Sequence, residues 1–255
     1  YIPSKPDKYG IKLVMMCDVR TKYMCDASPY LGKSTKSDGL PLSEHYVKLL
    51  SRTILKTKRN ITMDNWFTSV KLASELLRPE YQLTIVGTLR QNKAEIPPIM
   101  VQKDKTRKVG TSMFCFDKEV TMVSYKPKEN KIVTLLSTMH EQPEVNTVTK
   151  KPAIVECYNE TKGGVDSLDQ MCKNFSCNRK TKRWPLAIFY NILNIAAINS
   201  WIIFSENMAR RYENVAARKR YLFQLSDELV RPWMEQRLTI PKLHRPLKRK
   251  IEENI

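Results

Sequence analysis

The pattern of apolar and polar positions predicts an α/β core in the first 90 residues. A buried strand is predicted at residues 10–18, and further strands at residues 21–30, 59–64 and 81–89. Apolar residues at helical spacing predict a helix at residues 42–55. A second helix is predicted at residues 70–78, where Thr68 or Ser69 can cap its start and Pro79 ends it. The succession of strand, helix and strand over residues 59–89 further predicts two parallel strands joined by a right-handed crossover.

From residue 91 the pattern changes to short apolar segments separated by polar turns, at residues 112–116, 120–125 and 131–137. This spacing is typical of antiparallel strands. We interpret residues 91–152 as a small β-rich unit inserted into the α/β core, not as a continuation of that core. Arg90 and Lys93 stand at its start. They belong either to a solvated loop or to a surface that contacts phosphates.

The last third of the chain is predicted to be helical. Residues 184–204 contain no charged side chain and form a run long enough to cross a bilayer. Because Asn191, Asn194 and Asn199 would be costly in lipid, the pattern favours a buried core helix without membrane association. A second long helix is predicted for residues 205–238.

The composition adds a strong basic excess. The 255 residues contain 44 Lys and Arg against 26 Asp and Glu, a formal net charge of +18, which indicates a polyanionic partner, nucleic acid before an anionic membrane. The candidate DNA-contacting residues, besides Arg90 and Lys93, are Lys173, Arg179, Lys180, Lys182, Arg183, Trp184, Arg218, Lys219 and Arg220. The alternative is an ordinary basic surface, and for Trp184 packing in the core is favoured.

Other residue types exclude several kinds of chemistry. The six cysteines show neither a C-x-x-C pair nor a histidine partner at zinc spacing, so we interpret them as reduced thiols. There is no glycine-rich loop to cradle a nucleotide phosphate. The three histidines support no Ser/His/Asp arrangement.

Three aspartates are candidate metal ligands. Asp64 ends a predicted strand, where ligands bind in α/β sheets, although a simple turn residue is the alternative. An extended run ends at Gly163 and Gly164, and a helix-prone segment then carries Asp166 and Asp169. Positions three apart share a helix face, so both carboxylates can offer oxygen donors to a cation such as Mg²⁺. A helix N-cap is the alternative for Asp166.

Several longer strings resemble the piggyBac family of DNA transposases and follow the order expected for that family. They are Tyr1–Tyr9 (YIPSKPDKY), Met15–Asp18 (MMCD), Arg59–Ser69 (RNITMDNWFTS), Leu83–Thr88 (LTIVGT), Gly110–Asp117 (GTSMFCFD), Tyr158–Met171 and Arg179–Pro185 (RKTKRWP). The resemblance covers nearly the whole chain.

The resemblance implies a ribonuclease H-like core in which three aspartates hold two Mg²⁺ or Mn²⁺ ions. These ions serve the cutting and joining of double-stranded DNA at transposon ends, with TTAA targets. Asp64 matches the second family aspartate and Asp166 the third, while Asp169 matches a secondary acidic residue nearby. The resemblance also implies a homodimer that acts in the nucleus.

The family order divides the chain into four parts. Residues 1–90 form the first part of the core, 91–152 the β-rich insertion, 153–176 the second part of the core with the catalytic helix, and 177–255 a helical dimerisation and DNA-binding region. The first catalytic aspartate is expected upstream of Tyr1, so the 255 residues alone are predicted not to cleave DNA. The alternative is a domesticated or truncated derivative that binds DNA without catalysis.

Overall fold

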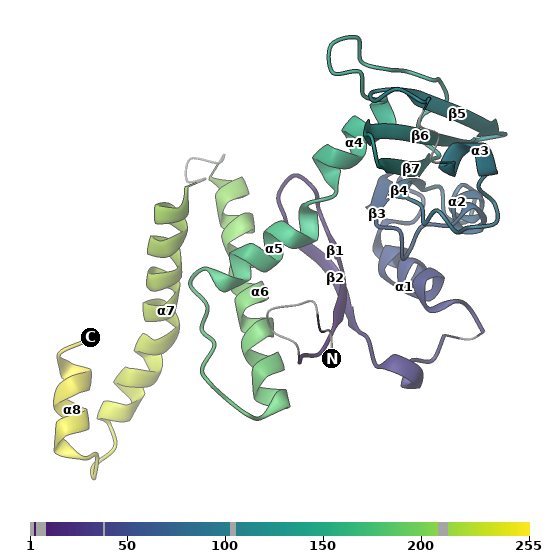
Figure 1. The fold of residues 1–255 in the computed structure, drawn as a ribbon. Helices are drawn as coiled ribbons and strands as arrows, with labels where there is room; N and C mark the ends of the chain where they lie inside the picture. Colours follow the sequence, from purple (N-terminus) through teal and green to yellow (C-terminus); the bar gives the residue numbers. More distant parts are fainter. Residues whose placement is uncertain (1–2, 4–8, 38, 103–105, 209–213) are drawn as a thin grey trace. The chain divides into compact units, whose positions relative to one another are not determined.

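The computed structural model describes residues 3, 9–37, 39–102, 106–208 and 214–255 (Figure 1). Most of the Tyr1–Tyr9 string therefore lies outside the described residues. The chain divides into two compact units, residues 1–168 and residues 169–255. The first unit is α/β and the second is helical.

Two sheets are formed by the described residues of the first unit. Their strands are β1 Leu13–Cys17, β2 Met24–Pro29, β3 Asn60–Met63, β4 Thr84–Thr88, β5 Ser112–Asp117, β6 Val120–Lys128 and β7 Lys131–Ser137. β1 and β2 make an antiparallel hairpin. The other strands make a mixed sheet with the order β3-β4-β7-β6-β5.

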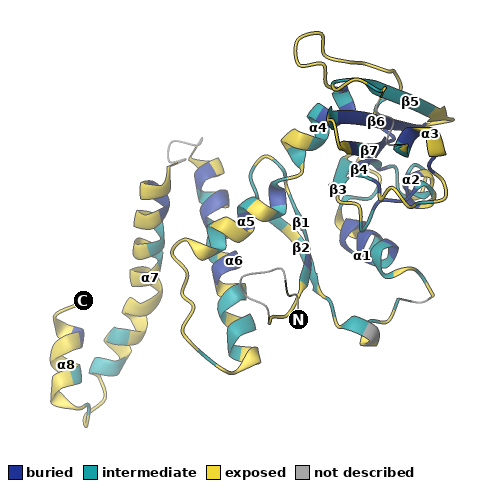
Figure 2. Cartoon of the chain, in the orientation of Figure 1, coloured by how far each residue is buried: buried dark blue, intermediate teal, exposed yellow. Residues whose placement is uncertain are grey.

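Helices cover both faces of the mixed sheet. The helices of this unit are α1 Leu42–Leu50, α2 Val70–Leu76, α3 Pro98–Val101 and α4 Ala153–Thr161, with 3₁₀ turns at Gly32–Ser34 and Ser51–Ile54. On one face, Leu76 and Met100 pack with Ile85 of β4. On the other face, Ile154 of α4 packs with Val86 of β4. The adjacent residues Ile85 and Val86 of β4 thus pack in two different cores. The three middle residues of β4 and most of β6 are buried (Figure 2).

The predicted strand–helix–strand unit is confirmed. β3 and β4 are parallel, and their register runs from Asn60 opposite Thr84 to Met63 opposite Gly87. The helix between them begins after Ser69, whose Oγ accepts a hydrogen bond of 3.2 Å from the backbone N–H of Leu72. Ser69 is therefore the N-cap.

Residues 91–152 do form antiparallel strands, but the prediction that they stand apart from the α/β core is wrong. β7 pairs antiparallel with β4, placing Val86 opposite Ser137 and Thr88 opposite Leu135. The physical reason is that β4 is buried on both faces and has hydrogen-bonding groups on both edges. β3 satisfies one edge and β7 the other, so the polar groups of this central strand are paired.

The second unit contains long helices. α5 Gly164–Lys173 begins in the first unit and ends in the second, and α6 Trp184–Asn207, α7 Val215–Leu238 and α8 Arg245–Glu252 follow. α6 packs on α7 through aromatic rings, because the Tyr221 ring centroid lies 5.3 Å from that of Trp201 and 4.8 Å from that of Phe204.

The prediction of a buried core helix holds for one face of α6 only. Ile195, Ile198 and Trp201 are buried, whereas Phe189 and Ile192 on the other face are exposed. Trp184 is 51% exposed, so the favoured prediction that it packs in the core is wrong. Of the described helices, α6 alone is long and apolar enough to cross a membrane. Its aromatic packing on α7 is typical of a helix that packs against protein.

Candidate functional site

Asp64 directly follows β3, at the carboxyl edge of the parallel pair β3–β4. Its Oδ1 accepts a hydrogen bond of 2.8 Å from the backbone N–H of Trp66. Its carbonyl oxygen accepts two more from the N–H groups of Phe67 and Thr68, each at 3.2 Å. The side chain is exposed. Asp64 is therefore a turn residue whose oriented carboxylate also stands where ligands bind in α/β sheets.

Aromatic packing anchors the backbone after Asp64. The rings of Trp66 and Phe67 meet edge to face at 4.7 Å, and Trp66 lies 6.3 Å from Tyr46 of α1. Nζ of Lys12 lies 4.5 Å from the centre of a Trp66 ring. These contacts tie the turn to α1 and to the β1–β2 hairpin, so the turn does not depend on its own hydrogen bonds alone.

Thr68 packs against Gly87 of β4 and stabilises the turn that follows Asp64. Oγ1 of Thr68 donates a hydrogen bond of 2.8 Å to the carbonyl oxygen of Asp64. A Cβ atom on Gly87 would lie 2.2 Å from this Oγ1 and 3.0 Å from the carbonyl oxygen of Met63. Glycine is thus required by close approach, as an isolated glycine inside a strand often indicates. The isolated glycine in the predicted strand at residues 81–89 is the sequence signal for this contact.

We expect Gly87→Ala to destabilise the fold by about 1–3 kcal/mol, the usual cost of overpacking a core. The added methyl group must displace Thr68 and with it the turn that orients Asp64. Chemical denaturation measures the loss. Gly10→Ala is the matched control, because nothing lies within 4 Å of a Cβ placed there. Equal stability of Gly87→Ala and the parent protein would show that Thr68 moves aside freely.

Asp166 lies in the first turn of α5 and is exposed. The residues before Gly163 form helix α4, so the prediction of an extended run there is wrong. The consecutive residues Ile154 and Val155 both pack in the same core, which a helix allows, whereas consecutive side chains of a strand point to opposite faces. Because α5 begins at Gly164, Asp166 is not the N-cap, although its charge near the helix N-terminus is favourable.

The end of α4, which leads to Asp166, is hydrogen-bonded to β3, the strand that leads to Asp64. Oγ1 of Thr161, near the end of α4, lies 2.7 Å from Oγ1 of Thr62 in β3. Thr62 stands two residues before Asp64, and Thr161 stands five residues before Asp166. The hydrogen bond therefore holds the chain leading to Asp166 against β3.

The three aspartates are not assembled into one ligand cluster. Among the described residues, no group of three His, Cys, Asp or Glu side chains is placed to hold a metal ion. Asp64 and Asp166 belong to the first unit and Asp169 to the second. Their shared role as metal ligands stays a prediction.

Arg90 places a positive charge next to the turn of Asp64. Its Nε donates a hydrogen bond of 3.2 Å to Oδ1 of Asn65, and its side chain is otherwise exposed. Lys93 follows and is half-buried. Because β3 and β4 are parallel, Arg90 stands just past the same edge of the sheet as Asp64. A phosphate approaching Asp64 would meet this cation.

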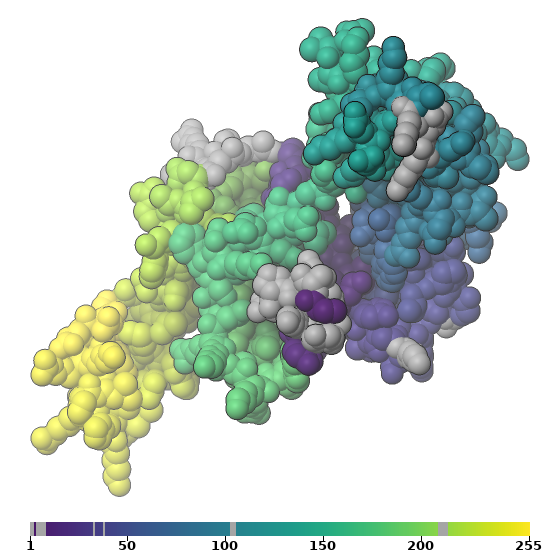
Figure 3. All heavy atoms as spheres, viewed as in Figure 1, coloured from purple at the N-terminus to yellow at the C-terminus, as the bar shows by residue number. Residues whose placement is uncertain are grey.

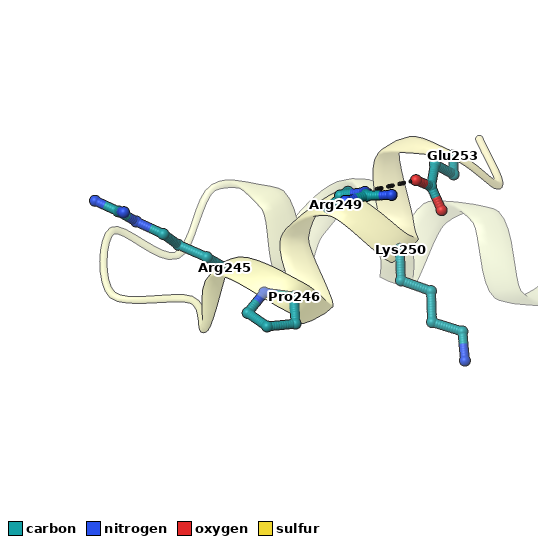
Figure 4. A pocket seen from close by; sticks show the side chains of 5 residues that line it. All are labelled: Arg245, Pro246, Arg249, Lys250 and Glu253. Carbon is teal, nitrogen blue, oxygen red and sulfur yellow. Dashed lines mark hydrogen bonds and ion pairs between the residues drawn. The ribbon is translucent and has the colours of Figure 1, made fainter.

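Most of the predicted DNA-contacting cations of the second unit face solvent. The exposed ones are Lys173, Arg179, Lys180, Lys182, Arg183, Lys219 and Arg220. The C-terminal residues, which include α8, also project long side chains into solvent (Figure 3). On α8, Arg245, Arg249 and Lys250 line a shallow concave surface with Pro246 and Glu253 (Figure 4). Nε of Arg249 donates to Oε1 of Glu253 at 2.8 Å, which offsets part of that charge.

Arg218 differs from its neighbours. It is only 5% exposed, and this burial contradicts the prediction that it contacts DNA. Its guanidinium carbon lies 5.3 Å from the ring centre of Phe175. Within the described residues its Nε and Nη2 have no hydrogen-bond partner, and it lines a cavity of about 20 Å³ with Cys172 and Asn194. Burial lowers the pKa of Arg218 and raises the pKa of the Cys172 thiol to about 11.

Comparison with known proteins places this architecture in a family. A solved chain described as a piggyBac transposase synaptic complex with hairpin DNA, studied by cryo-EM, superimposes on the whole chain with a TM-score of 0.92 and 52% sequence identity. Residues 1–201 match the family described as Transposase IS4. The chain belongs to the piggyBac-type transposases of this family. The resemblance predicted from the sequence is confirmed.

Two human proteins are more distant relatives of this piggyBac-type chain. PiggyBac transposable element-derived protein 3 is 24% identical and aligns with 79% of the chain, and PiggyBac transposable element-derived protein 2 is 24% identical and aligns with 56%. The chain spans 36% and 26% of their lengths, and 53% of the solved transposase chain.

The donors of this piggyBac-type chain fit part of a Mg²⁺ site. Asp64 and Asp166 offer exposed carboxylate oxygens, the ligand type that hard cations prefer. Mg²⁺ is commonly held by carboxylates together with waters and substrate phosphates, so these two carboxylates can supply part of its ligands. The hydrogen bond from the N–H of Trp66 to Oδ1 orients the carboxylate of Asp64, and the hydrogen bonds to its carbonyl oxygen hold its backbone.

Proposed function

We propose that this chain is part of a cut-and-paste DNA transposase, in which Asp64 and Asp166 hold divalent metal ions for strand cleavage and transfer. The observation that carries the proposal is the fit, over the whole chain, to a transposase solved in a synaptic complex with hairpin DNA. The carboxylate of Asp64 at the carboxyl edge of β3 supports it independently.

Each residue of the site has a role in this proposal. The metal ions, when bound, activate the attacking oxygen and stabilise the leaving oxygen of an in-line displacement at phosphorus. Asp64 and Asp166 would hold the ions from a strand end and a helix, both rigid elements. Arg90, whose Nε donates a hydrogen bond to Oδ1 of Asn65, would offset the negative charge of a phosphate group bound beside Asp64. Asp169 is a secondary ligand.

The proposed site needs a third carboxylate. Within the described residues, β3 pairs only with β4, so its other edge carries backbone groups that can accept a further strand. The family resemblance implies a strand upstream of Tyr1 that carries the first aspartate. A strand paired with β3 would bring its carboxylate beside Asp64. The core would then be ribonuclease H-like.

The proposed DNA interface comprises the exposed cations that follow α5, together with Trp184 and the pair Lys219 and Arg220. Their charges suit the phosphate backbone, and the exposed ring of Trp184 suits stacking. By family resemblance we further propose a homodimer that acts in the nucleus on transposon ends and TTAA targets.

We expect the 255-residue chain alone to bind duplex DNA without nicking it in Mg²⁺ or Mn²⁺. With one carboxylate missing, metal binding weakens and the nucleophile is misplaced. A supercoiled-plasmid assay with a chelator control measures this. Nicking that requires metal and is lost in Asp64→Asn would show that another residue of the chain supplies the third ligand.

A further inference from the structure

The basic segment after α5 is attached to α6 by one buried side chain. Asn194 lies inside α6 and is 6% exposed. Its Oδ1 accepts a hydrogen bond of 3.0 Å from the backbone N–H of Cys177. Its Nδ2 donates to Oγ of Ser176 and to Oδ1 of Asn178, both at 3.0 Å. The carbonyl group and both N–H groups of the amide are thus engaged by three consecutive residues.

Further contacts hold the same segment from other sides. The Phe175 ring stacks on the buried guanidinium of Arg218, and Phe175 has a φ of 63°, a left-handed conformation uncommon for a bulky residue. The Cys177 thiol lies 3.6 Å from the carbonyl oxygen of Tyr190. Residues 175–178 therefore have a defined conformation against α6 and α7.

This attachment determines where the neighbouring charges stand. Four exposed cations follow Asn178 within five residues, at Arg179, Lys180, Lys182 and Arg183. Asn178 is held by Asn194 at one end of this stretch, and Trp184 begins α6 at the other. A five-residue stretch fixed at both ends can adopt few conformations, so its charges are held near one arrangement.

We propose that Asn194 is a positioning residue for DNA binding: it holds the segment from Arg179 to Arg183 in the conformation that contacts the phosphate backbone, without itself touching DNA. This inference rests on the proposed DNA interface. It explains why this polar side chain is buried on the apolar face of α6, since among the described residues its amide is satisfied by the segment that it holds.

Asn194→Leu in the 255-residue chain tests the proposal, with Asn191→Leu, one turn earlier on α6, as the matched control. We expect Asn194→Leu to accelerate amide exchange at Cys177. We also expect it to flatten the dependence of log affinity on log salt by at least about 0.9, the contribution of one phosphate contact. Asn191→Leu should leave both quantities unchanged. A purely structural defect would reduce the active fraction of protein without changing the slope.

A second variant removes the hydrogen bonds without touching α6. Ser176→Ala combined with Asn178→Ala takes away both acceptors of Nδ2, and we expect the same flattening. Adding Asn194→Leu to alanine replacements of Arg179, Lys180, Lys182 and Arg183 should cause no further flattening, because the contacts are already lost.

The outcomes separate two failures. If the four alanine replacements leave the slope unchanged, the proposed DNA interface is wrong and the positioning role is overturned with it. If those replacements flatten the slope but Asn194→Leu accelerates exchange at Cys177 without flattening it, the interface stands and only the role of Asn194 is overturned.

Discussion

Asp64→Asn and Asp166→Asn are each expected to abolish metal-dependent DNA nicking in a form of this protein that is extended upstream to include the third carboxylate. Asparagine keeps the size of the side chain and removes the charge that binds the cation. The loss should exceed the roughly 10- to 100-fold cost typical of removing a partner of a metal ligand, because the ligand itself is lost. A plasmid-nicking assay in Mg²⁺ and Mn²⁺ measures the rates.

Asp117→Asn is the matched control for this experiment. Asp117 ends β5, the opposite edge strand of the mixed sheet, and is exposed like Asp64. Its replacement should leave nicking unchanged. Full activity of Asp64→Asn or Asp166→Asn would contradict the assignment of that residue. A complete lack of nicking by the extended parent protein would instead support the alternative, a derivative that binds DNA without catalysis.

Alanine at Arg179, Lys180, Lys182 and Arg183 together is expected to weaken DNA binding strongly and to reduce its salt dependence. Each phosphate contact contributes roughly 0.9 to the slope of log affinity against log salt, so the slope should fall by about 3 to 4 if all four side chains touch the backbone. Sequence preference should change less, since phosphate contacts position the protein and base contacts specify the site. Titrations at several salt concentrations give the slopes.

A variant with the same loss of charge controls for general electrostatics. Four exposed lysines of the first unit can be replaced together, Lys118, Lys128, Lys131 and Lys150. This control should shift affinity only slightly and keep the slope. Equal slopes for the wild type and the variant of the basic segment would show that its cations form a solvated surface and do not touch DNA.

Local features of the fold could be predicted from the sequence because they follow from short-range patterns. The strands β1 and β3 and the long helix α6 depend on neighbouring residues. The pairing of β7 with β4 could not be predicted in this way. It joins strands separated by about fifty residues, and its cause is the need of a doubly buried strand for partners on both edges.

Burial explains the errors at single residues. Arg218 and Lys219 are adjacent and equally basic in the sequence, yet only Arg218 is buried, on the face of α7 where Phe175 lies over its guanidinium. Trp184 looks like a core residue by type, but as the first residue of α6 it stays exposed. The roles of Thr68 and Asn194 depend on hydrogen bonds to distant or irregular segments, which no periodicity indicates.

The central claim is that Asp64 and Asp166 together hold the catalytic metal ions. Anomalous diffraction from Mn²⁺ in a DNA complex of the extended protein tests it most directly. We expect two ions about 3.5–4 Å apart, bound between the carboxylates of Asp64 and Asp166. Ions bound elsewhere, or carboxylates of Asp64 and Asp166 more than about 10 Å apart, too far to share such a pair of ions, would contradict the account.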